Sequence, residues 1–279
     1  MWFLLALVAG LLFAINKLIF RAVFVKEVNP VSFLAIHDGL AGLLLLPLAL
    51  LSFTLPQSPK VWAALVLGIL FIFIANYFAA LSLKNTEASI YQIVGQSRHV
   101  VVLFGAAILF SEPILPIKII SVLLIIAGVV VAIKQNTKIK LTKGIVYALI
   151  SGVAIGLAFL FIKLAAEDVR PVVSASMALI ISGFLSYLVT VVMKHKDTKI
   201  AVEHRSQLLI ASIIFAVFEL TLFTALDIGE ASRVTPVTQS SMIFTIVGAY
   251  IFLNERKHLT QKVVGASLIV LGIAILYFL

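Results

Sequence analysis

One apolar stretch of the chain carries a stripe of uncharged polar side chains. Ser89, Gln92, Gln96 and His99 follow one another at spacings of three, four and three residues, which places them on one face of a helix. Amides and hydroxyls both donate and accept hydrogen bonds, so such a face suits reversible binding of a small solute. The alternative interpretation is hydrogen bonding between packed membrane helices, for which the same side chains are used.

The stripe is repeated later in the sequence. Each of its members has a counterpart 143 residues further on, namely Ser232, Thr235, Gln239 and Met242. Because both copies keep amide and hydroxyl groups, we predict that they line one shared substrate site. Asn76 and Tyr77, in the preceding apolar stretch, extend this predicted site.

Placing a charged side chain inside a membrane-spanning stretch costs free energy, so a charged residue found there indicates a functional role. At 1.5 Å per residue, Lys17 and Asp38 lie about 10–12 Å inside consecutive helices, so we expect them to pair and to line the substrate site. In the alternative, Lys17 and Arg21 extend to the membrane interface and Asp38 is a structural counter-ion. Glu219 is the candidate for coupling transport to protons, and its alternative role is an ion pair with Arg98.

The elements that position these residues are predicted from composition. Of 279 residues, 62% are apolar and 12% are charged, about half the roughly 25% of a soluble domain. Ten membrane-spanning helices would use about 200 positions and leave short connections. The fold class is therefore an all-α integral membrane protein with ten transmembrane helices. The predicted spans cover residues 2–24, 31–54, 60–83, 88–110, 114–133, 144–165, 172–193, 206–228, 231–253 and 259–279.

An internal repeat divides these spans into two groups of five. Glu87-Ala88-Ser89 recurs as Glu230-Ala231-Ser232, and Glu112 recurs as Glu255, both at the offset of 143. Because five is odd, the second group must enter the membrane in the opposite orientation, as in many secondary transporters. We predict two inverted repeats, over residues 1–136 and 143–279. Glu112 and Glu255 are expected to cap the fifth and tenth helices.

Small residues recur at every fourth position of the first and sixth spans, at Ala6, Gly10, Ala14 and at Ala148, Gly152, Gly156. This spacing lets helices approach closely. We expect it to serve packing within the chain, with a homodimer contact as the alternative.

In its two five-helix halves, the proline before the second span of each half and the closing glutamates, the chain resembles the EamA-type drug/metabolite transporters. The tenth span also fits the Gly- and Leu-rich pattern of that superfamily, from Gly265 to Gly272. The resemblance implies a ten-helix secondary carrier that exports or exchanges amino acids or other metabolites. Where that superfamily carries a proline in the fourth and ninth spans, this chain has His99 and Met242, so no proline kink is predicted there.

The expected function is thus export or exchange of a small metabolite by alternating access, with an amino acid or related carboxylate-bearing solute favoured. The alternatives are a multidrug or organic-cation exporter and a membrane-embedded receptor or enzyme. No catalytic motif, metal-ligand cluster or nucleotide-binding loop is found in the sequence, so no enzyme activity, metal or cofactor is expected. The expected partners are the lipid bilayer, the solute, and protons or a counter-solute; nucleic acid is not one. We expect a monomer or homodimer.

Basic residues predict the orientation. Loops after odd-numbered spans hold thirteen Lys and Arg residues, whereas loops on the other side hold four. Because cytoplasmic loops carry the excess of positive charge, both termini are predicted to lie outside the cytoplasm. The expected location is the cell membrane (inner or plasma membrane), crossed many times.

Overall fold

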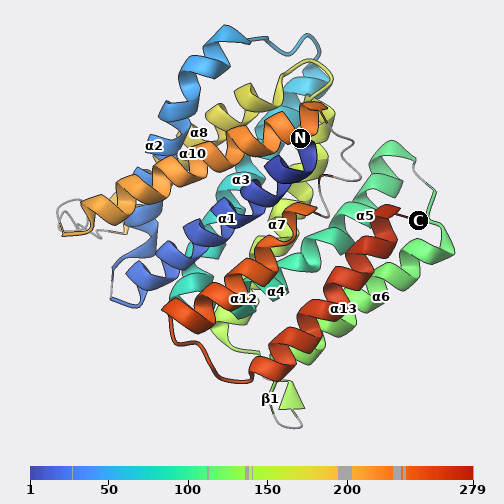
Figure 1. The fold of residues 1–279 in the computed structure, drawn as a ribbon. Helices are drawn as coiled ribbons and strands as arrows, with labels where there is room; N and C mark the ends of the chain where they lie inside the picture. The colour runs from blue at the N-terminus through green and yellow to red at the C-terminus, as the bar shows by residue number, and fades with distance from the viewer. Residues whose placement is uncertain are drawn as a thin grey trace.

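The computed structural model describes residues 1–26, 28–111, 113–135, 138–139, 141–193, 203–228, 234 and 237–278. Within these residues the chain is a bundle of helices (Figure 1). The first half contains α1 (Trp2–Phe24), α2 (Pro30–Leu51), α3 (Pro59–Asn85), α4 (Ala88–Val94), η1 (Gly95–Ser97), α5 (Arg98–Phe110) and α6 (Pro116–Ile133). The second half contains α7 (Lys143–Ala165), α8 (Pro171–Val192), α10 (Arg205–Ile228), α12 (Ser241–Phe252) and α13 (Leu259–Phe278).

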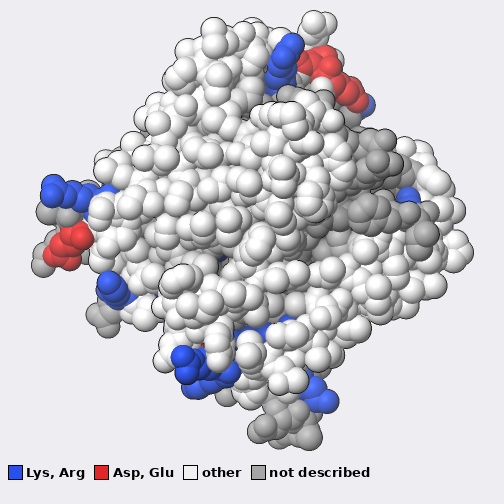
Figure 2. Space-filling model, viewed as in Figure 1, with Lys and Arg blue, Asp and Glu red and all other residues white. Residues whose placement is uncertain are grey.

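Eight of the helical stretches are long and apolar enough to cross a membrane, and α12 and α13 contribute two shorter apolar helices. The helical membrane fold is therefore confirmed at this level. Figure 2 shows a broad uncharged surface, with Lys, Arg, Asp and Glu gathered toward the edges of the visible face. Between the halves, β1 (Lys134–Gln135) pairs antiparallel with β2 (Lys138–Ile139). The strictly all-helical prediction misses this hairpin, whose two-residue strands are too short to give a pattern.

Local sequence explains where the helices begin. Proline occupies the first helical position of α2, α3, α6 and α8, where its missing N–H would have no partner inside the helix. The side chain of Asn29 caps α2 by accepting hydrogen bonds from the backbone N–H groups of Val31 (2.9 Å) and Ser32 (3.2 Å). Ser58 and Thr142 cap α3 and α7 in the same manner.

The two halves pack against each other in equivalent pairs. α1 packs on α10 and α12, and the corresponding helix of the second half, α7, packs on α3 and α5. α2 packs on its own counterpart α8, and α6 packs on its counterpart α13. The α2–α8 and α6–α13 contacts lie at opposite sides of the bundle (Figure 1). The helix packing thus has an approximate twofold symmetry that relates the repeated sequences.

Glycines lie at the α2–α8 and α6–α13 contacts. They allow the helices to approach closely, and their neighbours show in which direction the paired helices run. A Cβ atom on Gly128 would lie 2.5 Å from the carbonyl oxygen of Gly265, and one on Gly272 would lie 2.7 Å from that of Ser121. Since later residues of α13 face earlier residues of α6, the two helices run antiparallel. Contacts of Gly42 and Gly183 show the same antiparallel direction for α2 and α8.

The repeated small residues also pack inside the chain, as expected. A Cβ on Gly10 of α1 would lie 2.7 Å from Ser240 Oγ, and one on Gly152 of α7 would lie 2.3 Å from Ser97 Oγ. Ala6, Ala14 and Ala148 are fully buried or nearly so. Because Gly152 and Ser240 are the repeat counterparts of Gly10 and Ser97, these are two copies of one contact.

The fourth span of the first half is broken without a proline. α4 gives way to the 3-10 turn η1 at Gly95, and α5 begins at Arg98. In the second half α12 begins at Ser241, which is 143 residues after Arg98. The sequence predicts no proline kink here, and the 3-10 turn at Gly95 contains no proline.

Helices α5 and α12, which occupy equivalent places in the two halves, also end in the same way. Ser111 and Asn254, again 143 residues apart, have left-handed backbone conformations with φ of 55° and 56°. This region is unfavourable for most non-glycine residues and is common where a helix stops.

We expect Gly128→Ala to lower the thermal unfolding temperature in detergent, because the added methyl group would meet the backbone of α13, which cannot move aside. The estimated loss of stability is roughly 1–3 kcal/mol, as for other overpacked sites. Gly39→Ala is the matched control, because a Cβ on Gly39 has no neighbouring atom within 4 Å. Equal unfolding temperatures for the two variants would contradict the described α6–α13 contact.

Candidate functional site

A group of polar side chains joins the two halves near the middle of their spans. We call it the polar bridge; its members are Gln92, Gln96, Arg98, His99, Gln239 and Ser241. Arg98 donates through Nη2 to the amide oxygens of Gln96 (3.1 Å) and Gln239. Gln92 Nε2 donates to Ser241 Oγ across the halves (2.9 Å). The predicted substrate residues Gln92, Gln96, His99 and Gln239 are thus brought together.

Gln96 is the centre of this bridge. Its amide oxygen accepts from Arg98 and lies 3.2 Å from His99 Nε2, and its amide nitrogen donates to the carbonyl oxygen of Gln92 (3.1 Å). Since an amide oxygen only accepts, His99 Nε2 carries the proton in this contact. Gln92, Gln96 and His99 are each no more than 3% exposed. The bridge is therefore a buried network in which polar side chains of the two halves form hydrogen bonds with one another.

The helix break positions the bridge. Gln96 belongs to η1, where the backbone tightens, and Arg98 begins α5 directly after it. Gly152, near the middle of α7, lets η1 approach so closely that a Cβ there would lie 3.1 Å from the carbonyl oxygen of Gly95. The polar bridge consequently lies at the depth of the centre of α7.

A second group of polar side chains lies further along α1, between the polar bridge and the C-terminal end of that helix. We call it the charge cluster; its members are Asn16, Lys17, His37, Asp38, Asn76, Ser182 and Glu219. Gly10 lies against Ser240 and Ser241 at the depth of the bridge, and Lys17 follows seven residues later, or about 10 Å along the helix. The single cavity predicted from sequence is therefore resolved into two neighbouring polar groups.

Asp38 accepts three hydrogen bonds within the charge cluster. Its Oδ2 accepts from Asn76 Nδ2 (2.9 Å) and from Ser182 Oγ (2.6 Å), and its Oδ1 lies 2.8 Å from His37 Nδ1. The donors come from α2, α3 and α8, so Asp38 joins both halves. A fully buried carboxylate is stabilised in its ionised form by such donors.

The proton position on His37 follows from its other neighbour. Asn16 Nδ2 donates to the carbonyl oxygen of Ala211 (3.0 Å), which fixes the orientation of that amide because a carbonyl oxygen only accepts. The same Nδ2 lies 3.1 Å from His37 Nε2, so Nε2 is the acceptor. His37 is therefore neutral, with its proton on Nδ1 facing Asp38.

Lys17 lies among aromatic rings. Its Nζ is 4.9 Å from the ring centre of Phe13, 5.0 Å from that of Phe20 and 5.3 Å from that of Phe215. The side chain is 4% exposed, so it does not extend to the membrane interface. Asp38 and Glu219 act on it electrostatically. The predicted direct pair with Asp38 is wrong, because His37, Asn76 and Ser182 occupy that carboxylate and no salt bridge joins it to Lys17 within the described residues.

Glu219 lies on α10 one helical turn after Phe215, whose ring centre is 5.3 Å from Lys17 Nζ and 5.3 Å from the ring of His37. Its side chain makes no hydrogen bond or salt bridge in the part of the chain that the structure describes. The alternative ion pair with Arg98 is wrong, since Arg98 donates to the amide oxygens of Gln96 and Gln239. Glu219 therefore belongs to the charge cluster and not to the polar bridge.

Of the remaining predicted site residues, the structure describes Tyr77 but not Thr235. Tyr77 is partly buried and packs on the rings of Phe73 and Phe78. Thr235 lies outside the described residues, as do Ser232 and Glu112. Among the described residues no group of three or more His, Asp or Glu side chains is arranged to hold a metal ion.

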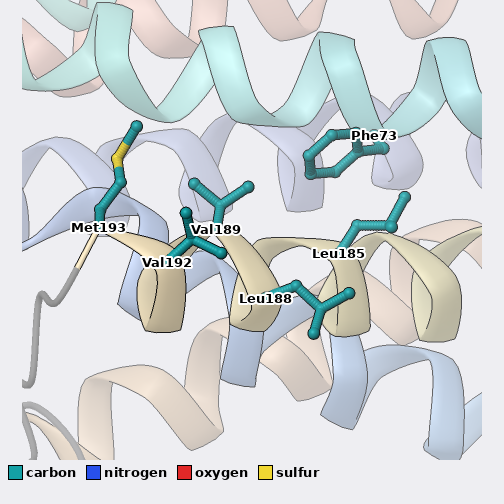
Figure 3. Close-up of a pocket in the computed structure, with 6 residues that line it drawn as sticks. All are labelled: Phe73, Leu185, Leu188, Val189, Val192 and Met193. Atoms are coloured by element: carbon teal, nitrogen blue, oxygen red, sulfur yellow. The ribbon is translucent and has the colours of Figure 1, made fainter.

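An apolar groove of about 280 Å³ lies between α3 and α8. Figure 3 shows Phe73 facing a row of α8 side chains, Leu185, Leu188, Val189, Val192 and Met193. Ser97 is the one polar residue that lines a second pocket of about 230 Å³. Neither pocket includes a member of the polar bridge or the charge cluster.

Glu255 links the two halves at one end of the bundle. Its carboxylate accepts from Arg21 Nε (3.2 Å), from the backbone N–H of Ala88 (3.0 Å) and from the hydroxyl of Ser89 (3.2 Å). Glu255 thus caps α4 of the first half, and the predicted cap on the tenth helix is wrong. Lys262 of α13 adds a salt bridge to Glu87 beside it.

Sequence reasoning missed several of these partners. Asn16, His37, Ser182 and Ser241 are members of the two polar groups that the spacing along the sequence does not predict. Each acts through a contact with a different helix, so spacing along one helix gives no signal for it. The Asn16-Lys17 and His37-Asp38 dipeptides inside apolar stretches were the available signal.

The comparison with protein families decides the classification. The family model described as EamA-like transporter family matches residues 1–134 and residues 142–278, which is nearly the whole chain in two copies. The chain belongs to the EamA-like transporter family. The resemblance seen in the sequence is confirmed, and the chain is a multi-pass membrane protein of a family of transporters.

A solved structure supports the fold. The chain is 17% identical to a protein described as "Crystal structure of protein", with a TM-score of 0.65 over 98% of this chain and 94% of that one. At this identity the similarity shows the fold alone. No curated protein matches the chain.

We expect Glu255→Gln to lower the thermal unfolding temperature in detergent. The new amide group would place N–H donors against the N–H groups of Ala88 and Ser89 and would leave Arg21 without its carboxylate. An unsatisfied buried polar group costs roughly 1–3 kcal/mol. Glu203→Gln, at an exposed position, is the matched control. If the two variants unfolded at the same temperature, the Glu255 contacts would contribute nothing to holding the halves together.

Proposed function

We propose that this EamA-like protein is a secondary transporter that exports or exchanges a small metabolite by alternating access. It would use ten transmembrane helices arranged as two inverted five-helix repeats, residues 1–136 and 143–279. The antiparallel packing of α2 on α8 and of α6 on α13 supports the inversion, because helices related by a twofold axis in the membrane plane run antiparallel. Two equivalent halves can exchange conformations and so expose a central site to either side.

The observation that carries this proposal is the polar bridge. Gln92 and Arg98 of the first half form hydrogen bonds with Ser241 and Gln239 of the second half. When the halves separate, these groups lose their partners at a depth where the bilayer offers none. A polar solute that replaces them would make separation favourable, which is the behaviour required of a transport site.

The chemistry of the bridge favours a carboxylate-bearing solute, with an amino acid as the leading candidate. Arg98 and His99 supply N–H donors, and a guanidinium binds a carboxylate through two parallel hydrogen bonds. Arg98 donates to the amide oxygens of Gln96 and Gln239, and a carboxylate is a stronger acceptor than an amide oxygen. The proposed substrate-binding residues are Lys17, Asp38, Asn76, Tyr77, Gln92, Gln96, His99, Thr235 and Gln239, with Glu219 for coupling.

One observation favours a different substrate. Three phenylalanine rings surround the ammonium group of Lys17, and aromatic rings with nearby carboxylates are a common binding site for organic cations. A multidrug or organic-cation exporter is therefore the second candidate. Thermal stabilisation of the purified protein by quaternary ammonium compounds, and not by amino acids, would favour it.

We expect Gln96→Leu and Gln239→Leu to fold and to transport poorly. Each removes an amide that binds Arg98, and an unpaired buried polar group costs roughly 1–3 kcal/mol, or about tenfold or more in transport. Flux of a metabolite panel into proteoliposomes, under a proton gradient and under exchange conditions, is the measurement. Gln57→Leu, at an exposed loop position, is the control with the same substitution.

Normal flux in both variants would show that the bridge is structural. Absence of flux for the unmodified protein, across the whole panel and under both conditions, would contradict the transporter proposal itself.

We also predict that both termini lie outside the cytoplasm, because the loops after odd-numbered predicted spans carry most of the basic residues. The location would be the inner or plasma membrane. A reporter fused to the C-terminus that works only outside the cytoplasm should be active, and one that works only in the cytoplasm should be silent. The reverse result would invert the topology.

A further inference from the structure

The charge cluster contains two carboxyl groups, Asp38 and Glu219, but only one ammonium group, Lys17. α10 carries Glu219 and packs against α1, α2 and α8. Phe215, one turn before Glu219, packs against Lys17 of α1 and against His37 of α2, so Lys17 and the neighbouring Asp38 are the charged groups on this side of α10. The remaining titratable group of the cluster, His37, is neutral because Nε2 accepts from Asn16. α8 contains no Asp, Glu, Lys, Arg or His.

Two carboxylates therefore share one ammonium group inside the membrane. With both carboxylates ionised, the cluster holds one net negative charge, which is costly in a medium of low polarity. Binding one proton makes the cluster neutral. The position of that proton depends on which carboxylate is better satisfied as an anion.

The hydrogen bonds distinguish the two carboxylates. Asp38 accepts from His37, Asn76 and Ser182, so all three neighbours present donors to it. Glu219 receives no hydrogen bond among the described residues. A proton placed on Asp38 would require one of these donors to turn away, whereas a proton on Glu219 displaces nothing.

We propose that the charge cluster is a binding site for a single proton, which resides on the Glu219 carboxyl group while Asp38 remains ionised. On binding, an O–H bond forms between a Glu219 oxygen and a proton from water; on release the electron pair returns to that oxygen. No other bond changes. The ammonium group of Lys17, whose Nζ lies within 5.3 Å of the ring centres of Phe13, Phe20 and Phe215, is the cation of the cluster that faces these carboxylates.

The site is also placed to couple to transport, and this part of the inference rests on the proposed function. Lys17 and Glu219 lie on α1 and α10, which belong to different halves and pack on each other. Loss of the proton would draw the Glu219 carboxylate toward the ammonium group of Lys17. The protonation state of Glu219 would thereby bias how the two halves pack.

Infrared difference spectroscopy of the purified full-length protein in detergent tests the proton site without any substrate. Ordinary exposed carboxyl groups titrate near pH 4, so they stay ionised above about pH 5. On lowering the pH from about 9 to about 5 we expect a carbonyl band from one newly protonated buried carboxyl group. Carbon-13 labelling of glutamate should shift this band, and labelling of aspartate should not.

Variants then assign the residue. Glu219→Gln should abolish the band, and Glu203→Gln, at an exposed position near the start of the same helix, should retain it. Lys17→Met should retain the band but make it persist to higher pH, because the counter-ion that favours the carboxylate is gone. The labelling result needs no variant, so it stands even if Glu219→Gln fails to fold.

A band that shifts with aspartate labelling, that survives in Glu219→Gln, or that is missing in the unmodified protein would overturn the inference. Transport separates this from the wider proposal. Proton binding without flux of any panel solute would refute the transporter and leave the proton site. Flux that is equally driven by a proton gradient in the unmodified protein and in Glu219→Gln would refute the coupling role and leave the transporter.

Discussion

The constraint on which this structure depends is that polar groups inside a bilayer must find partners within the protein. Arg98 meets it by binding amide oxygens from both halves, and Asp38 meets it with three donors from three helices. Those contacts require helices from opposite halves to lie close together. Glycines at positions such as 128 and 152 permit that approach. The close packing of the helices is therefore what allows the buried polar groups to reach their hydrogen-bond partners.

The packing of the helices is nearly symmetric between the two halves, but the ionisable residues Arg98 and Glu219 each occur in one half only. Two copies of the Gly–Ser contact and two left-handed helix ends relate the halves at the same offset. The counterpart of Glu219 is Asn76, and the counterpart of Arg98 is Ser241. A symmetric frame suits two similar conformations of comparable energy. Arg98 and Glu219, whose counterparts are uncharged, are what would make the two conformations respond differently to a solute or a proton.

Much of this was predictable from the sequence, because apolar length and the repeat depend on patterns along the chain. Nine of the ten predicted spans agree with the described helices to within a few residues, whereas the ninth, 231–253, is matched only by α12 from Ser241 to Phe252. Gln92, on the predicted polar face, does form a hydrogen bond with the second half. What failed depends on the rotation and partners of separate helices. Glu255 caps a helix that begins 167 residues earlier, and Asp38 accepts from Asn76 and Ser182 instead of pairing with Lys17.

The central claim is that the buried polar bridge opens to water during transport. Because the chain has no cysteine, Gln239→Cys would introduce a single thiol, and Ser206→Cys at an exposed position provides a control of equal chemistry. The measurement is the rate at which a charged, water-soluble thiol reagent labels each variant in membrane vesicles. The account predicts slow labelling at position 239 that changes with the proton gradient or with added metabolite. A thiol at position 239 that stays unreactive under every condition, while position 206 is labelled, would contradict it.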